Sequence, residues 1–577
     1  MNNRFKYFIT GILLIMSSGI ANAEAGNRVT ERIYLSTDRI SYIAGETLWF
    51  SAYCLDVSNA LKLSDLSSVA YIELHNSTSV VLTAKLFLID GRGSGHISLP
   101  PAIPTGNYRI VAYTKQMLNE EQPQLFEKVI SVFNVLTTEK VPGNVEILTE
   151  NSVVIANEQK ESALSLSSLG AQNEVEVKFG QGGRILPLNS TVPITLSNTG
   201  NNNVSVNVTV VKVDSLPIDN TKSISTFINN INHGVFLPDA LYVPEYEGEI
   251  IKGKVNLKGE GSLWDKIIFL SAVGDNAEVY SSVVDSIGAF NFYTNSFFGD
   301  REIVLEIPSA DSTYNFTYEL NDPFLKKVDN NIPKLILDRK FEQSLSERSI
   351  EMQIGRRFGI DTLYDKLPFH NDPLLRTKPV VYKLDDYTRF PVMQEVMIEY
   401  ISELRFRKLD GKQDLQMRWE DSYKTLSYSR GNTLVLLDGI PVFDHTKIFN
   451  YDPLKVKSIS IYGSEFFVGY ASFEGLVLFK TYKRDYSGLT FGRNVRIMDF
   501  QGALIPSKFT ANGIAKADNF PDLRSLLYWN PQIDLKPGVS NDINIHTSSL
   551  PGKYIIKIEG FTGNGLSVEY SSEFTVR

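Results

Sequence analysis

Apolar and polar residues alternate with a period of two over most of this chain, in short runs separated by turn residues. Examples are residues 108–113, 204–214 and 554–558, each of which follows a stretch rich in Gly, Pro or Asn. Such alternation places successive side chains on opposite faces of a strand, so that one face of each run is buried. The pattern predicts a mainly β fold built from tandem Ig-like β-sandwiches.

Two segments carry helical spacing instead. Apolar residues recur at intervals of three and four in residues 393–404, the spacing of an amphipathic helix that packs on a sheet. Residues 340–360 mix Arg and Glu with widely spaced Leu and Ile, which is typical of a polar helical connector. The chain therefore predicts a helical connector followed by one α+β domain.

The most informative run is TLVLLDGIPVF at residues 433–443, followed by VKSISIYG at 456–463 and GLVLFKTYK at 475–483. Asp438-Gly439 predicts a turn, because Gly tolerates positive φ and Asp can bond to its own backbone. In this order and spacing the three runs resemble the plug domain of TonB-dependent outer-membrane receptors, over residues 380–485. The resemblance implies a structural or partner-contact role for Leu436, Asp438, Gly439, Pro441, Gly463 and Gly475.

Two further segments resemble known domain types. YLSTDRISYIAGETLWFSAY (34–53) and the PTGNYRIVAYT that ends at residue 114 resemble the second macroglobulin-type domain of the α2-macroglobulin family. Residues 244–320 resemble transthyretin-like, carboxypeptidase-regulatory domains.

Protease-trapping macroglobulins carry a thioester motif, Cys-Gly-Glu-Gln, whereas Cys54 is followed by Leu-Asp-Val. The alternating strand around Cys54, the only cysteine, predicts a buried structural thiol.

These patterns predict seven segments in the 577 residues. They are a signal peptide (1–23), a macroglobulin-type sandwich (28–136), a second sandwich (145–225), a carboxypeptidase-regulatory-like sandwich (244–320), a helical connector (321–379), a plug-like domain (380–485) and a C-terminal sandwich (488–577). This order resembles a group of exported Bacteroidota proteins that join a macroglobulin-type domain, a carboxypeptidase-regulatory-like domain and a plug-like domain without a barrel.

The first 23 residues have the pattern of a signal peptide. Arg4 and Lys6 precede an apolar centre at 9–16, and Ala21-Asn22-Ala23 forms a small-residue cleavage site. The pattern predicts an exported protein that resides in the periplasm, at the outer membrane or on the cell surface.

A receptor barrel does not fit behind the plug-like segment. Only 97 residues follow Lys480 (577 − 480). A barrel of ~22 strands with ~9–11 residues each needs more than ~200. We therefore expect a plug-like domain without a pore, which associates with membranes through partners rather than through a transmembrane helix.

No pattern for catalysis, cofactor binding or metal binding is found. The six histidines lie far apart, and no HExxH, P-loop or G-x-S-x-G motif occurs. A net charge of −9 without a basic run argues against nucleic acid as a partner. We expect a protein that is not an enzyme and has no cofactor.

The leading hypothesis is a non-enzymatic envelope protein, a scaffold or binding protein that docks a partner through its plug-like domain. The partner would be an envelope or outer-membrane protein, such as a barrel protein or an energy-coupling protein. Two alternatives remain. One is a macroglobulin-like protease inhibitor that lacks the thioester, and the other is a carbohydrate-binding surface protein that uses exposed aromatic residues.

Overall fold

The computed structural model describes most of residues 29–577. The residues outside this description are 1–28, 59–60, 149–173, 181–182, 218–222, 240, 260, 275–277, 296, 309–313, 330, 359–363, 367–377, 410, 421–425, 430–431 and 510–520. The predicted signal peptide lies outside the described residues. As predicted, the fold is mainly β, with paired sheets and few helices.

Two sheets form the first domain. One has the order β1-β3-β4 with β7 beside β3, and the other has the order β2-β9-β8-β5-β6. Their elements are β1 (Glu31–Thr37), β2 (Ser41–Ile43), β3 (Thr47–Asp56), β4 (Lys62–Leu63), β5 (Val69–His75), β6 (Val80–Phe87), β7 (Arg92–Ser98), β8 (Gly106–Tyr113), η1 (Gln116–Asn119) and β9 (Phe126–Phe133). Cys54 in β3 is a free, fully buried thiol, and burial raises its pKa. The predicted buried thiol is confirmed.

The second sandwich is built from two distant parts of the chain. Its sheets have the orders β11-β13-β36 and β12-β38-β37-β14-β35. Their strands are β11 (Val175–Phe179), β12 (Ile185–Leu186), β13 (Thr191–Asn198), β14 (Val204–Lys212), β35 (Leu526–Leu535), β36 (Ser540–His546), β37 (Gly552–Thr562) and β38 (Ser567–Val576). Valines of β14 and isoleucines of β37 share one core. The prediction of separate sandwiches at 145–225 and 488–577 is therefore wrong, because each part supplies strands that only the other completes.

The third sandwich also takes a strand from the C-terminal part. Its sheets have the orders β18-β15-β20 and β17-β16-β19-β33. Their strands are β15 (Ile250–Lys258), β16 (Ile267–Ala272), β17 (Glu278–Val283), β18 (Ala289–Tyr293), β19 (Asp300–Glu306), β20 (Asn315–Leu320) and β33 (Val495–Gln501). β33 was predicted within the C-terminal sandwich, but it pairs with β19 in antiparallel register from Asp300↔Gln501 to Glu306↔Val495.

Residues 380–485 form an α+β domain around the five-stranded sheet β23-β29-β32-β27-β28. A second sheet, β24-β25-β26, and the hairpin β30–β31 flank it. The elements are β23 (Val380–Lys383), η4 (Leu384–Asp386), α4 (Met393–Tyr400), β24 (Leu404–Leu409), β25 (Lys412–Glu420), β26 (Leu426–Tyr428), β27 (Leu434–Leu437), β28 (Ile440–Pro441), α5 (Thr446–Phe449), η5 (Pro453–Lys455), β29 (Val456–Tyr462), β30 (Phe466–Val468), β31 (Ala471–Phe473) and β32 (Leu476–Thr481).

Connecting elements run between the sandwiches. They are β10 (Val145–Ile147), α2 (Ile224–Asn229), β21 (Leu335–Leu337), η2 (Arg339–Phe341), α3 (Glu342–Phe358), β22 (Tyr364–Lys366) and β34 (Ser507–Phe509). α3 lies within the segment predicted as a helical connector, and that segment also holds strands, because β21 pairs with β10 and β22 pairs with β34. Buried Arg348 of α3 forms ion pairs with Glu46 of the first domain and with Asp214, which follows β14.

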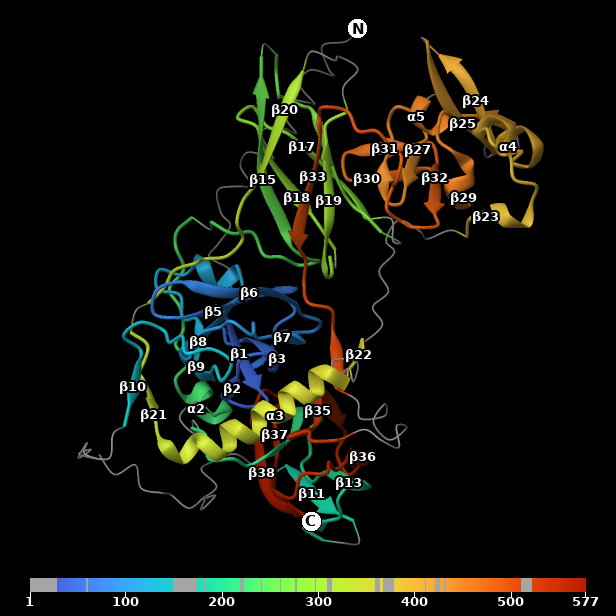
Figure 1. The fold of residues 1–577 in the computed structure, drawn as a ribbon. Helices are drawn as coiled ribbons and strands as arrows, with labels where there is room; N and C mark the ends of the chain where they lie inside the picture. The colour runs from blue at the N-terminus through green and yellow to red at the C-terminus, as the bar shows by residue number, and fades with distance from the viewer. Residues whose placement is uncertain are drawn as a thin grey trace.

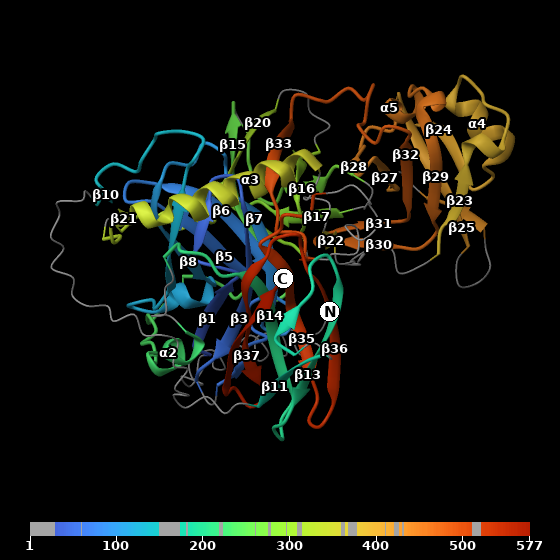
Figure 2. The same cartoon turned by 60° about the horizontal axis from the view of Figure 1, so that its bottom comes forward.

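Polar and aromatic contacts also join the sandwiches. Trp49 of the first domain packs on Trp529 of the second sandwich, with ring centroids 4.8 Å apart. Lys85 of the first domain pairs at 2.7 Å with Glu249, which lies at the start of the third sandwich. In two views the α+β domain lies at the edge of the molecule, beside the third sandwich and away from the second (Figures 1 and 2).

Candidate functional site

The residues singled out by the plug resemblance lie at two ends of one sheet. Leu436, Asp438, Gly439 and Pro441 are together at the turn between β27 and β28. Gly463 follows β29 and Gly475 precedes β32, at the end where Tyr462 pairs with Leu476. Because β27 runs parallel to β32 and begins at that end, the two glycines lie at the opposite end of the strands from Asp438. The structure therefore brings four of the six residues together.

Asp438 holds the turn through a network of hydrogen bonds. Its φ is 49°, in the left-handed region, and its side chain is buried. Thr481 donates to Oδ1 from its backbone N–H at 2.8 Å and to Oδ2 from its hydroxyl at 2.7 Å. The backbone N–H of Tyr486 also donates to Oδ2, at 3.1 Å. Asp438 thus joins the end of β27 to the chain that leaves β32, which is a structural role.

The same turn contacts the third sandwich. The backbone carbonyl of Asp438 accepts a hydrogen bond from the backbone N–H of Gly274 at 3.0 Å. Gly439 has a φ of 89°, and a Cβ added there would lie 2.4 Å from the carbonyl oxygen of Ala272. Glycine is therefore required at this position both for its backbone conformation and for the close approach of the sandwich.

β27 is buried on both faces, which explains why residues 434–437 are apolar without interruption. Val435 and Leu437 belong to the core beneath α4, together with Met393 and Val396. Leu434 and Leu436 belong to a second core, which they share with Phe269 and Val279 of the third sandwich, among others. The α+β domain and the third sandwich therefore share a hydrophobic interface.

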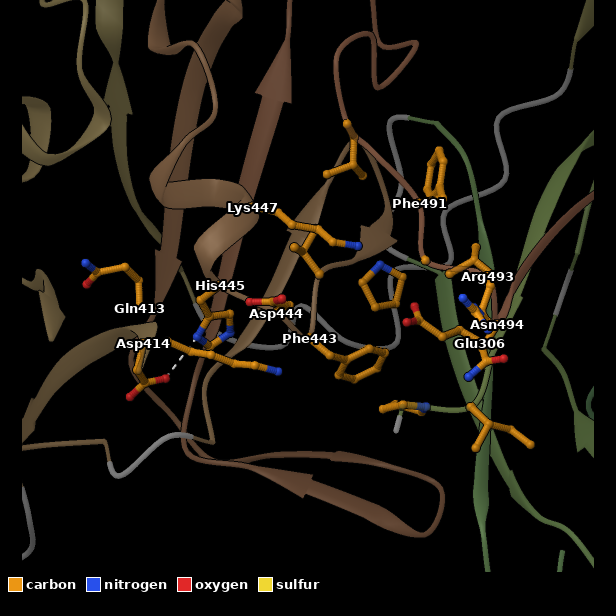
Figure 3. A pocket seen from close by; sticks show the side chains of 18 of the residues that line it. Glu306, Gln413, Asp414, Phe443, Asp444, His445, Lys447, Phe491, Arg493 and Asn494 are labelled. Atoms are coloured by element: carbon orange, nitrogen blue, oxygen red, sulfur yellow. Dashed lines mark hydrogen bonds and ion pairs between the residues drawn. The ribbon is translucent and has the colours of Figure 1, made fainter. Parts of the chain in front are cut away.

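An open cleft of about 640 Å³ lies beside this interface. Its walls come from the end of β19, the loop before β33, the start of β25 and the segment around α5. Pro441 is the residue of the predicted motif that lines it. Figure 3 shows Lys447 and His445 on the side of the α+β domain, and Glu306, Arg493 and Asn494 on the side of the sandwich.

Glu306 and a histidine–aspartate pair are among the titratable groups that line the cleft. Burial raises the pKa of Glu306 to about 7, and the charge of Lys447 opposes that rise. His445 is buried, and its Nδ1 lies 3.0 Å from Oδ1 of Asp414 and 3.0 Å from the backbone nitrogen of Leu415. Oδ2 of Asp414 is buried and has no hydrogen-bond partner among the described residues.

The sequence pattern did not single out these groups. His445 and Asp444 directly follow the GIPVF run, and this adjacency was the only signal available. Asp414 and Glu306 lie about 30 and about 140 residues upstream of His445. These residues come together only in the folded chain, where the end of β19 in the third sandwich lies beside the α+β domain.

The described residues hold neither a candidate membrane-spanning helix nor a candidate cluster of metal ligands. None of the helices in this part of the chain is long and apolar enough to span a bilayer. Within the same residues, no three His, Cys, Asp or Glu side chains gather as candidate metal ligands.

Comparison with known proteins gives a likeness only among solved structures. No protein-family model and no curated protein matches the chain. Salmonella alpha-2-macroglobulin reacted with methylamine is similar over 96% of this chain and 40% of its own, at 8% identity and a TM-score of 0.24. Escherichia coli alpha-2-macroglobulin activated by porcine elastase is similar over 95% of this chain and 44% of its own, at 8% identity and a TM-score of 0.24.

A bacterial adhesin is also among these structures. The Yersinia pseudotuberculosis adhesin InvE is similar over 51% of this chain and 61% of its own, at 10% identity and a TM-score of 0.14. The chain spans less than half the length of the two macroglobulins. At these TM-scores the likeness carries no conclusion about what the chain does.

Proposed function

We propose that the chain is an exported, non-enzymatic scaffold protein of the bacterial envelope that docks a partner protein through its α+β domain. The observation that supports this most directly is the burial of β27 between two cores, one within the domain and one shared with the third sandwich. A domain fixed in this way is presented at the edge of the molecule in a set orientation (Figure 1). Preorganisation of this kind lowers the entropy cost of binding a partner.

The outer surface of the α+β domain carries exposed apolar side chains that suit docking. Ile398 of α4 is 71% exposed, and Val380 and Val381 of the edge strand β23 are 47% and 49% exposed. An exposed apolar edge strand is normally protected, because it offers unpaired backbone groups to another chain. A docked partner would cover both features.

The location and the identity of the partner are part of the same proposal. The basic start, apolar centre and Ala-x-Ala site of residues 1–23 favour export to the periplasm or the outer membrane. An envelope or outer-membrane protein, such as a barrel protein or an energy-coupling protein, is the class of partner that the plug resemblance favours.

Site-specific photocrosslinking in envelope extracts tests the proposal. A crosslinking residue at Ile398 should capture a discrete envelope protein. The same residue at Leu566, an apolar position on the second sandwich that is 46% exposed, should not capture it and serves as the matched control. The same capture from both positions, or none from Ile398, would show that the α+β domain is not the docking surface.

A further inference from the structure

The cleft beside the α+β domain is an open part of its interface with the third sandwich. On one side of this interface, Phe269 of β16 and Val279 of β17 share a core with Leu436 and Leu478. Glu306 pairs with Phe269 on one neighbouring strand and with Val495 on the other, so the three lie side by side across the sheet. Glu306 and Val495 nevertheless line the cleft. The sheet face that is closed at β16 is therefore open at β19 and β33.

Both sides of the cleft carry charged groups, and Arg493 on the sandwich side and Asp444 on the α+β side belong to them. Glu306 lies on the sandwich side, and Lys412 and Lys447 lie on the α+β side. Lys447 points across the cleft toward the sandwich in Figure 3. Among the described residues, no ion pair or hydrogen bond engages the carboxyl group of Glu306 (Figure 3). A half-buried carboxyl group without a partner is costly, and a ligand that supplies a donor or a cation removes that cost.

Apolar surface lies between the charged groups. Phe443 packs on Phe269 with ring centroids 4.8 Å apart, and Phe491 packs edge-on against Tyr486 at 5.5 Å. Both phenylalanines are only partly buried and line the cleft. The volume of about 640 Å³ lies within the range of ligand-binding pockets, which often occur between domains.

We propose that this cleft binds a short peptide segment of the docking partner. Glu306 receives a basic side chain of the peptide, Phe443 and Phe491 hold an apolar side chain, and Lys412 with Lys447 receives an acidic side chain or a terminal carboxylate. A peptide supplies both signs of charge and an apolar group within a few residues. The inference rests on the docking function proposed above and names the chemistry of the bound segment.

A fluorescent positional-scanning hexapeptide library, titrated against the full chain, tests this inference. We expect binding by peptides that carry a basic residue, an apolar residue and an acidic residue. Glu306→Gln should lower the binding affinity for peptides with a basic residue at least tenfold. Lys447→Glu should lower the affinity for peptides with an acidic residue by a similar factor. The matched control is Glu302→Gln, on the same face of β19, because Glu302 accepts a hydrogen bond from Tyr486 and does not line the cleft.

Each outcome decides one of the two proposals. Absence of peptide binding, or equal binding by the wild type and the cleft variants, overturns the peptide site. Capture from Ile398 that persists unchanged in the Glu306→Gln, Lys447→Glu double variant also overturns it, and leaves the docking function standing. Peptide binding without any capture from Ile398 overturns the docking function, and leaves the cleft as a peptide site.

Discussion

Two buried carboxylates, Asp438 and Glu245, lie at contacts between domains. Asp438 fixes a turn in the α+β domain while its backbone bonds to the third sandwich. Glu245 lies where the first domain meets the third sandwich, and its carboxyl group accepts hydrogen bonds from the hydroxyl of Tyr71 and from the backbone N–H of Ile250. Three donors bind the carboxylate of Asp438. The carboxyl group of Glu245 is buried, and burial is the main influence on its pKa. The two therefore respond differently to substitution and to pH.

Asp438→Asn separates the turn conformation from its hydrogen bonds. Asn tolerates the left-handed backbone, but its amide would face the N–H of Tyr486 and the hydroxyl of Thr481 in place of an acceptor oxygen. We expect the free energy of unfolding of the domain to fall by about 1–3 kcal/mol, the usual cost of leaving a buried donor without an acceptor. Hydrogen exchange should show lower protection of the amides of Thr481 and Tyr486. Unchanged protection would contradict the role assigned to Asp438.

Glu245→Gln should change how stability depends on pH. Burial raises the pKa of Glu245 from its ordinary value of 4.5 to about 7, while the hydrogen bond from Ile250 opposes the rise and the charge of Glu249 adds to it. Lys115 lies nearby and also opposes the shift. A carboxyl group with a raised pKa favours the folded state while it is protonated, so its contribution is lost as pH rises from about 4.5 through about 7. The Gln variant keeps an acceptor and escapes this loss.

Thermal unfolding between pH 5 and pH 8 measures the effect of this substitution. We expect the wild type to lose more stability over this window than the variant, by on the order of 3 kcal/mol at most. Glu247→Gln, an exposed carboxylate two residues away, should follow the wild-type curve and serves as the control. Parallel curves for the wild type and Glu245→Gln would rule out ionisation of Glu245 as the cause.

At the scale of elements, β27 connects two cores through adjacent side chains. Leu436 belongs to the core shared with the third sandwich, and Leu437 belongs to the core beneath α4. The sequence predicted a turn at Asp438-Gly439, and the structure has it there, directly after the buried strand β27. The run does not alternate between apolar and polar residues, which indicates that both of its faces are buried. The local pattern does not show which domain covers the second face, because that domain comes from a distant segment.

Leu436→Ala and Leu437→Ala should therefore lower the stability by similar amounts but loosen different parts of the molecule. Each removes a fully buried side chain, and each should destabilise by about 2–5 kcal/mol. Hydrogen exchange should rise in β16 and β17 for Leu436→Ala, and in α4 for Leu437→Ala. The two adjacent substitutions serve as controls for each other. The same exchange pattern in both variants would show that β27 does not separate the two cores.

At the scale of the whole molecule, the C-terminal part completes two earlier domains. β33 extends the third sandwich, and β35 and β37 lie on either side of β14 in the second. Alternation along each strand predicted which side chains are buried, because burial of one face is a local property. Strand partners more than 300 residues apart leave no such local trace, so the local pattern alone predicts a separate C-terminal sandwich. The cleft escaped prediction for the same reason, since its charged groups come from separate segments.

Truncation after residue 487 tests this arrangement. β14 would lose both of its neighbours, and the core that its valines share with β37 would be exposed. We expect limited proteolysis to cut within β14 in the truncated chain and to spare β14 in the full chain. If this segment stayed protected in the truncated chain, the first part would form a sandwich by itself, contrary to the observed pairing.

During synthesis, β14 is made long before the strands with which it pairs. A ribosome that adds ~5–20 residues per second needs roughly 15 to 60 seconds to travel the about 300 residues from β14 to β35. Throughout that interval the valines of β14 lack their neighbouring strands and are free to associate with other chains. Production of this protein should therefore depend on a chaperone that holds the nascent chain until its last strands emerge.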